Sequence, residues 1–506
     1  MVSCVSVNKY NGRIETPIAP DLLKKDIDYA YEQLQKLHPN LYWYIDKESL
    51  DYKFDSLKTT INQPLKPNEF YYKLAPVIAD IKEGHLRLVP REKKLTRTEI
   101  KKLKNQRGLL SRYSYIIKND RIYVSGNPDK IPNMEVGTEI LEIHGIPTSE
   151  LLKKYRKLVN SDGENQTFQK YILANRWPSY FSAEHGILDS VKMVTKYKKE
   201  VDSFYLKREI ITPIIRKKEE AKERKLSNTE RGKTKDYNPV TKSYNREIQF
   251  MSADQSIVYL KIKTFSGTHS KKFYRESFEQ IRKSGTKYLI LDIRENFGGS
   301  LAEIHNLYSY LVPHRFEFIK DIEVTSRTSM LEARYLSEFP TLLKPLAVLG
   351  YPFYVVGTLF LVKKENEQFY LRNNDLFTLK KPKKNFFNGE IYVLVNGGSF
   401  SAASILPAKL KYEKRAFLVG EETGGANDGT VAGRYAMKKL PESKLHLPIG
   451  LMLIQPSIKF TQTKKGVTPH VEIIPTTDDL LKKRDVQLGW VLQHIEKIEQ
   501  MKKPQL

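Results

Sequence analysis

Two loops of small residues each follow an apolar run that predicts a buried strand, and both could take part in catalysis. The first loop, residues 292–299, ends in the pair Gly298-Gly299, and the second, residues 396–404, contains Ser401. Paired glycines after a strand expose backbone N–H groups, as a site for an oxyanion requires. A serine at a strand-to-helix turn lies where the positive end of the helix stabilises developing negative charge. Each loop alone is only a turn, but two at equivalent ends of core strands favour a catalytic site.

A serine nucleophile needs a base, either a histidine or a neutral lysine. Ser401 lacks the flanking glycines of a G-x-S-x-G nucleophile elbow, so an α/β-hydrolase is not expected. Among the ten histidines, His85 stands out because Gly84 precedes it where a predicted helix gives way to a strand. A lone histidine is more often structural than catalytic, so the residues alone leave both interpretations of His85 open.

The spacing of apolar residues predicts the elements that must position these side chains. Apolar residues three and four apart predict helices over 20–37 and 68–82. Nearly continuous apolar runs at 288–293 and 391–395 predict strands that are covered on both faces. Strands alternate with helices over residues 250–475, which indicates a mixed α/β core.

Composition excludes several classes of protein. The 506 residues include 85 Lys plus Arg and 59 Asp plus Glu, a net charge of +26, and 40% of the residues are hydrophobic, which excludes wholesale disorder. The charge is spread along the chain, with a local maximum near residues 216–235, and this favours a solvated surface over a nucleic-acid or membrane footprint. No zinc-finger, phosphate-loop or RNA-binding motif supports nucleic-acid binding. A single cysteine excludes a disulfide scaffold and a Cys-based zinc site.

Two segments bear on membrane association. Residues 1–4 lack the apolar run of a signal peptide, yet Val2-Ser3-Cys4 resembles the end of a bacterial lipoprotein signal, in which the cysteine is lipidated. A stray cysteine is the competing interpretation. Residues 345–362 carry no charge, but prolines and glycines interrupt them, so the segment predicts a buried strand and turn rather than a membrane span.

Six motifs occur between about residues 70 and 475: YYKLAPVIADIKEGHLRL, VGTEILEIHGIP, YLILDIRENFGGS, IYVLVNGGSFSAAS, RAFLVGEETGG and GVTPHVEI. In this order they resemble the tail-specific (C-terminal processing) serine peptidase family, in its subgroup related to the tricorn core protease and interphotoreceptor retinoid-binding protein modules. No single motif is specific, but the combination is. The resemblance implies a crotonase/ClpP-like catalytic core, a helical N-terminal region and a degenerate PDZ-like domain around residues 105–200.

The resemblance also implies a role for individual residues. Ser401 falls on the family's nucleophile. The lysine-using branch has its lysine where this chain has Ala426, which cannot accept a proton, whereas the histidine-using branch has its base in the Gly-His element, here His85. The implied oxyanion hole consists of the backbone N–H groups of Gly298, Gly299 and Ala402.

The chain also departs from the family pattern. In the histidine-using branch a glutamate shortly before the GVxPD element orients the imidazole. Residues 459–465 contain no glutamate, and their polar neutral residues include Gln462 and Thr463. An amide or hydroxyl can hold a tautomer, yet it stabilises an imidazolium less than a carboxylate does, so reduced activity is expected. The family's aspartate in GVxPD is His470 here, and its glutamate after the serine motif is Ser404.

The expected fold is α/β and multidomain, with five parts. These are an N-terminal helical region carrying the Gly-His element (1–90), a PDZ-like domain (91–206), a basic flexible insertion (207–246), a catalytic core (247–477) and a C-terminal helix (478–506).

The expected function is that of a serine-type peptidase, an endopeptidase or carboxy-terminal processing protease, in which Ser401 attacks and His85 is the base. The alternative is a catalytically weak or inactive homologue that binds peptides or other ligands. The resemblance implies no metal or organic cofactor and no nucleic-acid partner, and the PDZ-like segment would bind an extended peptide by strand addition. We expect the protein in a bacterial cell envelope or periplasm, attached to the membrane through a lipidated Cys4.

Overall fold

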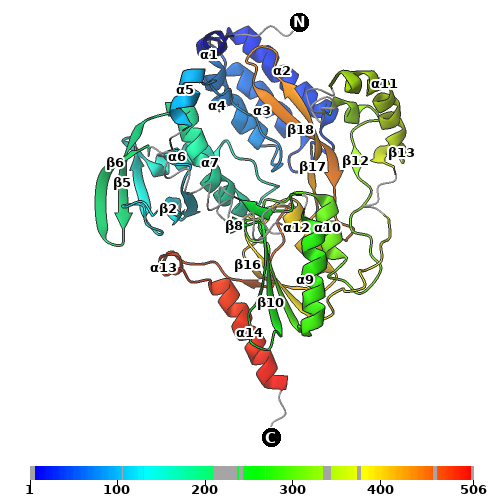
Figure 1. The fold of residues 1–506 in the computed structure, drawn as a ribbon. Helices are drawn as coiled ribbons and strands as arrows, with labels where there is room; N and C mark the ends of the chain where they lie inside the picture. The colour runs from blue at the N-terminus through cyan, green and yellow to red at the C-terminus, as the bar shows by residue number, and fades with distance from the viewer. Residues whose placement is uncertain are drawn as a thin grey trace.

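The computed structural model describes residues 6–502 except 105, 107, 129, 209–235, 239–242, 268, 334–343, 373–377 and 460–463. Cys4, Gln462, Thr463 and most of the predicted insertion lie outside the described residues. The chain forms a helical N-terminal region, a middle region around an antiparallel sheet, and a larger core built on two further sheets (Figure 1). The prediction of a mixed α/β, multidomain architecture is confirmed.

Helices make up the region before His85. They are α1 (Val7–Glu15), α2 (Pro20–Leu37), α3 (Lys47–Thr59) and α4 (Pro67–Ala79). The α2 helix has its predicted bounds and buries the predicted apolar stripe, including Leu23, Ile27 and Leu34. The α4 helix ends at Ala79, three residues earlier than predicted, and Lys82 then adopts a positive φ of 58°. The chain therefore turns sharply just before Gly84 and His85.

The middle region is built on an antiparallel sheet with helices packed against it. Its strands follow the order β1 (Ser114–Lys118), β2 (Arg121–Gly126), β3 (Glu139–Ile143), β5 (Ser190–Tyr197) and β6 (Glu200–Lys207), and β4 (Ile146–Pro147) pairs with β3. Its helices are α5 (Arg97–Leu103), α6 (Thr148–Arg156) and α7 (Thr167–His185). Trp177 of α7 is fully buried, and its ring contacts that of Tyr115 on β1 edge-on.

The core sheet brings the two predicted catalytic loops to one edge. Its order is β19 (Val471–Glu472), β16 (Phe417–Gly420), β15 (Glu390–Val395), β11 (Tyr288–Asp292), β10 (Ile257–Ile262) and β9 (Arg246–Phe250), all parallel except β9. Every residue of β11 is buried, as is all of β15 after its first residue, which confirms the prediction of strands covered on both faces. Because Asp292 pairs with Leu394 in parallel register, both following loops leave the same edge.

A second sheet joins the core to the N-terminal helices. Its order is β13 (Val362–Glu365), β14 (Gln368–Leu371), β12 (Glu323–Val324), β18 (His446–Ile454) and β17 (Thr430–Lys439). At the β17–β18 turn, the N–H groups of Glu442 and Ser443 donate to the buried carboxylate of Asp26 on α2 at 2.8 and 2.7 Å. Val89 pairs with His446 as an isolated bridge. The segment that follows His85 is therefore fixed to this hairpin.

The remaining helices lie around the core sheet. They are α9 (Ser270–Ser284), α10 (Leu301–Tyr308), α12 (Ala402–Tyr412), α13 (Thr477–Leu481) and α14 (Val486–Lys502), with a 3₁₀ turn at Ser329–Glu332 and a short strand pair, β7 (Tyr237–Asn238) and β8 (Ser243–Tyr244). Residues 478–506 thus contain all of α14 and all but the first residue of α13. Arg294, in the first loop, forms ion pairs of 2.7 Å with Asp292 and with Asp485, the residue before α14.

The uncharged stretch at 345–362 is a helix, so the prediction of a strand and turn there is wrong. The helix α11 (Lys344–Leu361) exposes large apolar side chains, among them Leu349, Phe353 and Phe360. Periodicity alone cannot separate a strand from a helix in a continuously apolar run, and the richness in Val, Tyr and Phe pointed the wrong way. Within the part of the chain that the structure describes, no helix is long and apolar enough to cross a membrane.

Candidate active site

Ser401 lies at the turn between β15 and α12. Its φ of 59° and ψ of −123° place a non-glycine residue in a strained backbone conformation, of a kind that clusters at functional sites. The turn is held because the Ser401 carbonyl accepts the N–H groups of Ser404 and Ile405, at 2.8 and 3.1 Å, and the Ser404 hydroxyl at 2.8 Å. The positive end of α12 therefore begins at the predicted nucleophile.

Hydrogen bonds among buried groups lock the two predicted loops together. The participating side chains of Asn396 and Ser399 are almost completely buried. The bonds between the loops run from Phe400 N–H to the Asn296 carbonyl (3.0 Å), from Glu295 N–H to Asn396 Oδ1 (2.9 Å) and from Ser399 Oγ to the Ile293 carbonyl (2.8 Å). The paired glycines are thereby fixed relative to the predicted nucleophile.

The predicted oxyanion donors differ in their availability. Gly298 N–H donates to Asn296 Oδ1 at 2.9 Å, so it already has an acceptor. Among the described residues, the N–H groups of Gly299 and Ala402 have no acceptor. A Cβ on Gly298 would lie 2.8 Å from Ser401 Cβ, and the φ of Gly298 is +96°, so only glycine allows this approach. The Gly298-Gly299 turn thus lies directly against Ser401.

The structure places His85 beside the predicted nucleophile. Its ring stacks on that of Phe400, the residue before Ser401, with 4.6 Å between centroids and 30° between planes. Gly84 permits this contact, because a Cβ there would lie only 2.7 Å from the Phe400 ring. Phe400 stacks in turn on Phe168 of α7 at 3.9 Å. Residues far apart in the sequence therefore converge on one site.

Two groups that the sequence reasoning missed face Nδ1 of His85. Thr430 Oγ1, at the start of β17, lies 2.8 Å away, and Oε1 of Glu83 lies 3.4 Å away. Oε2 of Glu83 also accepts the backbone N–H of His85 at 3.1 Å. The position of Glu83, two residues before His85 in the EGH motif, was the available signal; Thr430, 345 residues away, gave none.

The surroundings of Glu83 favour the ionised form of its side chain. It is buried, with 3% of its surface exposed. Burial disfavours the charged form, but hydrogen bonding with His85 and the electrostatic effects of His85 and His38 outweigh it, so the pKa of Glu83 is lowered. The site therefore contains a carboxylate beside the predicted base, although residues 459–465 provide none.

The buried side chain of Asp162 binds the turn that carries Gly84 and His85. Asp162, from the connection between α6 and α7, accepts Gly84 N–H at 2.7 Å and Ala426 N–H at 3.1 Å. Burial and then the charge of Glu83 raise the pKa of Asp162 to about 7. Asp162 thus joins the middle region to His85 and to the loop where the family's lysine-using branch has its lysine.

Two other residues singled out from the sequence have separate structural roles. His470 accepts Leu418 N–H on Nδ1 at 2.9 Å and stacks on Phe417 at 4.7 Å, so it caps the edge of the core sheet. Ser404 supports the turn at Ser401, as described above. No hydrogen bond between Ser401 and His85 occurs in the described part of the chain. Such bonds are often long in ligand-free sites and tighten when substrate binds.

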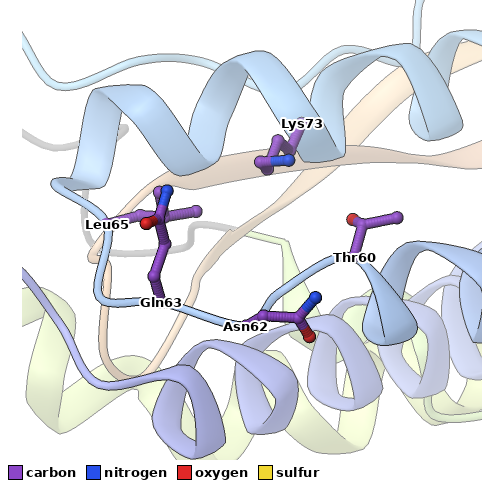
Figure 2. A pocket seen from close by; sticks show the side chains of 5 residues that line it. All are labelled: Thr60, Asn62, Gln63, Leu65 and Lys73. Carbon is purple, nitrogen blue, oxygen red and sulfur yellow. The ribbon is translucent and has the colours of Figure 1, made fainter.

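The N-terminal region contains a separate cavity of about 300 Å³ (Figure 2). Lys73 of α4 lies on one side, and Thr60, Asn62, Gln63 and Leu65, from the segment after α3, line the rest. None of the predicted catalytic residues contributes to it, so this cavity is not part of the candidate active site.

Comparisons with known proteins agree with this geometry. Residues 256–473 match the family model of Peptidase family S41. The structure of mature CPAF complexed with lactacystin is similar over 95% of this chain and 98% of that one, with a TM-score of 0.61 and 16% sequence identity. A structure of mature CPAF alone covers 92% and 95% of the two chains, with a TM-score of 0.58 and 16% identity. A search of curated protein sequences found no match.

The fold and the family match define a hydrolase of the serine peptidase class. Residues 256–473 contain both loops of small residues, and the fold is shared with CPAF over nearly the whole chain. Residues 256–473 match the model of peptidase family S41, which confirms the resemblance that the six motifs indicated.

Proposed function

We propose that the protein cleaves peptide bonds of protein substrates, as an endopeptidase or carboxy-terminal processing protease, with Ser401 as nucleophile and His85 as base. The observation that carries the proposal is the convergence of the two on Phe400. The turn at Ser401 begins α12, the His85 ring stacks on the preceding residue, and the free N–H groups of Gly299 and Ala402 lie next to that turn.

Each group has a defined part in the reaction. Ser401 Oγ forms a bond to the scissile carbonyl carbon while Nε2 of His85 takes its proton. The carbonyl oxygen, now negative, accepts the N–H groups of Gly299 and Ala402. His85 then gives the proton to the leaving amine as the C–N bond breaks, and water hydrolyses the acyl-enzyme in the same way.

Gly298 has a supporting part in this proposal. Its N–H is committed to Asn296 Oδ1, so it fixes the loop rather than binding the oxyanion. Of the three predicted oxyanion donors, the proposal therefore keeps two, the N–H groups of Gly299 and Ala402. This arrangement keeps both remaining donors in place before substrate binds, as electrostatic stabilisation requires.

The middle region is proposed to bind the substrate chain. Its antiparallel sheet ends in the edge strands β1 and β6, and a strand edge can pair with an extended peptide. Asp162, in the middle region, bonds to Gly84, the residue before His85. A peptide bound to the middle region would therefore be held close to the candidate active site. A PDZ-like role of residues 91–206 is part of this proposal.

Labelling with a fluorophosphonate probe tests the proposal, because only an activated serine reacts with it. We expect one labelled residue, identified as Ser401 by peptide mass spectrometry, and no labelling of the heat-denatured protein. Since a CPAF structure with this fold contains lactacystin, that compound serves as a competitor for the probe. A folded protein that no probe labels would favour the alternative of an inactive homologue that binds peptides.

The proposed location is a bacterial cell envelope, with Cys4 lipidated. The sequence Val2-Ser3-Cys4 supports this, as the end of a lipoprotein signal would. Mass spectrometry of the protein isolated from its own cells tests it. An acylated cysteine at the mature N-terminus is the expected result, and an unmodified Met1 or Val2 contradicts it.

A further inference from the structure

The base role of His85 requires one particular tautomer. To take a proton from Ser401 on Nε2, the neutral imidazole must carry its own hydrogen on Nδ1. The groups around Nδ1 therefore determine what fraction of the His85 side chains carries the hydrogen on Nδ1 and can act as the base. Those groups are the Thr430 hydroxyl at 2.8 Å and the Glu83 carboxylate at 3.4 Å.

Thr430 alone cannot select this tautomer. A hydroxyl both donates and accepts, so it can bond to Nδ1 whether or not that nitrogen carries the hydrogen. An ionised carboxylate can only accept. Its negative charge beside Nδ1 favours an N–H there and also stabilises the imidazolium that forms during catalysis. The choice between the two tautomers thus depends on Glu83.

Glu83 is held where it can exert this effect. Oε2 accepts the backbone N–H of His85, and Oε1 lies 3.4 Å from Val431 N–H, next to Thr430. The carboxylate is buried, so its field at His85 is weakly screened. The other titratable groups that act on Glu83 or feel its charge are His38, Asp162, Tyr44 and Tyr435. None of them contacts the imidazole by a hydrogen bond in the described part of the chain.

We infer that Glu83 is the positioning carboxylate of His85, which keeps the proton on Nδ1 and stabilises the imidazolium in place of the glutamate missing from residues 459–465. The inference rests on the proposed function of His85 as base. It assigns the orienting role to the residue two positions before the base, on the same turn, rather than to a distant loop. Thr430 completes the arrangement by fixing the plane of the ring.

The test compares Glu83→Gln with the wild type on a fluorogenic peptide from pH 5 to 9. Gln keeps the size of the side chain but can donate to Nδ1, so we expect kcat to fall by roughly 10- to 1,000-fold while KM changes little. The acid limb of the kcat profile should move to lower pH, since the imidazolium loses its counter-charge. Glu83→Asp should recover part of the lost rate, and Thr430→Val should lower kcat less than Glu83→Gln does.

Glu422→Gln is the matched control. Oε1 of Glu422 also accepts a backbone N–H, that of Gly466 at 2.7 Å, and the side-chain amide of Asn165 at 3.0 Å. The polar contacts of His85 in the described part of the chain do not include Glu422. We expect its kcat and pH profile to match the wild type. Two results would show that the role of Glu83 is purely structural. One is an equal loss of kcat in Glu83→Gln and Glu422→Gln, and the other is a pH profile of Glu83→Gln whose acid limb lies at the same pH as that of the wild type.

A direct measurement of the tautomer does not depend on turnover. In ¹⁵N-labelled Ser401→Ala protein, the imidazole nitrogen shifts of His85 should show the hydrogen on Nδ1 above the pH at which the ring titrates. A dominant Nε2–H tautomer overturns the inference, even if Glu83→Gln fails to fold. If wild-type protein neither turns over peptide nor reacts with fluorophosphonate while Nδ1–H is observed, the proposed function fails and the assignment of Glu83 stands.

Discussion

The proposed nucleophile, Ser401, and the proposed base, His85, are held in different ways. Ser401 is fixed by main-chain groups and neutral side chains, those of Asn396 and Ser399, at one edge of a parallel sheet. His85 bonds to the buried Glu83 and to Thr430, and the buried Asp162 accepts the N–H of the preceding Gly84. The hydrogen bonds named for Ser401 involve only neutral groups, whereas those around His85 include the carboxylate of Glu83. We therefore expect the base half of the site, and not the nucleophile half, to respond to pH.

Ser401→Ala removes the nucleophile and has the largest expected effect. Cleavage of an unfolded protein substrate should be abolished, because the neighbouring hydroxyls of Ser404 and Ser399 already donate to backbone carbonyls. The melting temperature should stay close to that of the wild type, since one hydroxyl is lost from a half-buried turn. Ser404→Ala is the control and should keep much of the activity, because it removes one of three bonds to the Ser401 carbonyl. Equal loss in both variants would show that Ser401 is not the nucleophile.

His85→Ala removes the base and should lower kcat by several orders of magnitude, as in other serine–histidine systems. Wild-type activity should fall at acid pH, because only the neutral ring accepts the proton. Steady-state rates from pH 5 to 9 check both points. A wild-type rate that does not vary over this range would indicate another base.

Asp162→Asn should change the free energy of unfolding more than the rate of catalysis. The buried Asp162 has a pKa raised from 3.8 to about 7, so the folded state favours its protonated form. That contribution to stability is fully present below about pH 4 and is lost as the pH rises through 7. Asn cannot accept the N–H groups of both Gly84 and Ala426, so the variant should be less stable overall. Because Asn does not titrate, the variant should also lack this pH dependence.

Urea unfolding at pH 5, 6, 7 and 8 checks this prediction. The free energy of unfolding of the wild type should fall relative to that of Asp162→Asn as the pH rises across this range. Parallel pH profiles for the two proteins would show that Asp162 stays ionised in the fold. Ser399→Ala, which removes a buried neutral hydroxyl from the nucleophile half, is the matched control and should keep the wild-type profile.

Replacing residues 216–235 by a short Gly/Ser linker should have the smallest effect. These residues carry none of the family motifs and few large apolar side chains, so stability and peptide hydrolysis should stay nearly unchanged. The replacement must end before Asp236, because this buried carboxylate pairs with the buried Arg246 at 2.5 Å. Extending it through Asp236 should therefore lower the melting temperature. Loss of folding with the shorter replacement would contradict the prediction.

The difference between the surroundings of Ser401 and those of His85 also explains how much of the site the sequence could predict. The strands at 288–292 and 390–395, and the loops after them, were evident because apolar runs and small residues are local signals. His85 was identified from its resemblance to the Gly-His element. Thr430 and Asp162 could not be found, since nothing in a sequence shows which distant hydroxyl or carboxylate folding brings to a ring. Glu83 was not predicted as the orienting group, because the family pattern places that glutamate near residues 459–465.

The bond between His85 and Thr430 joins residues 345 positions apart, and this affects the order in which the site can form during synthesis. The ribosome makes the base first, the nucleophile much later and Thr430 after both. A chain that has emerged only as far as Ser401 has both reacting residues but lacks the β17–β18 hairpin that holds the imidazole ring. Because such long-range contacts form late in folding, hydrolysis should begin only after this hairpin has docked, which protects the nascent chain from cleavage by its own active site.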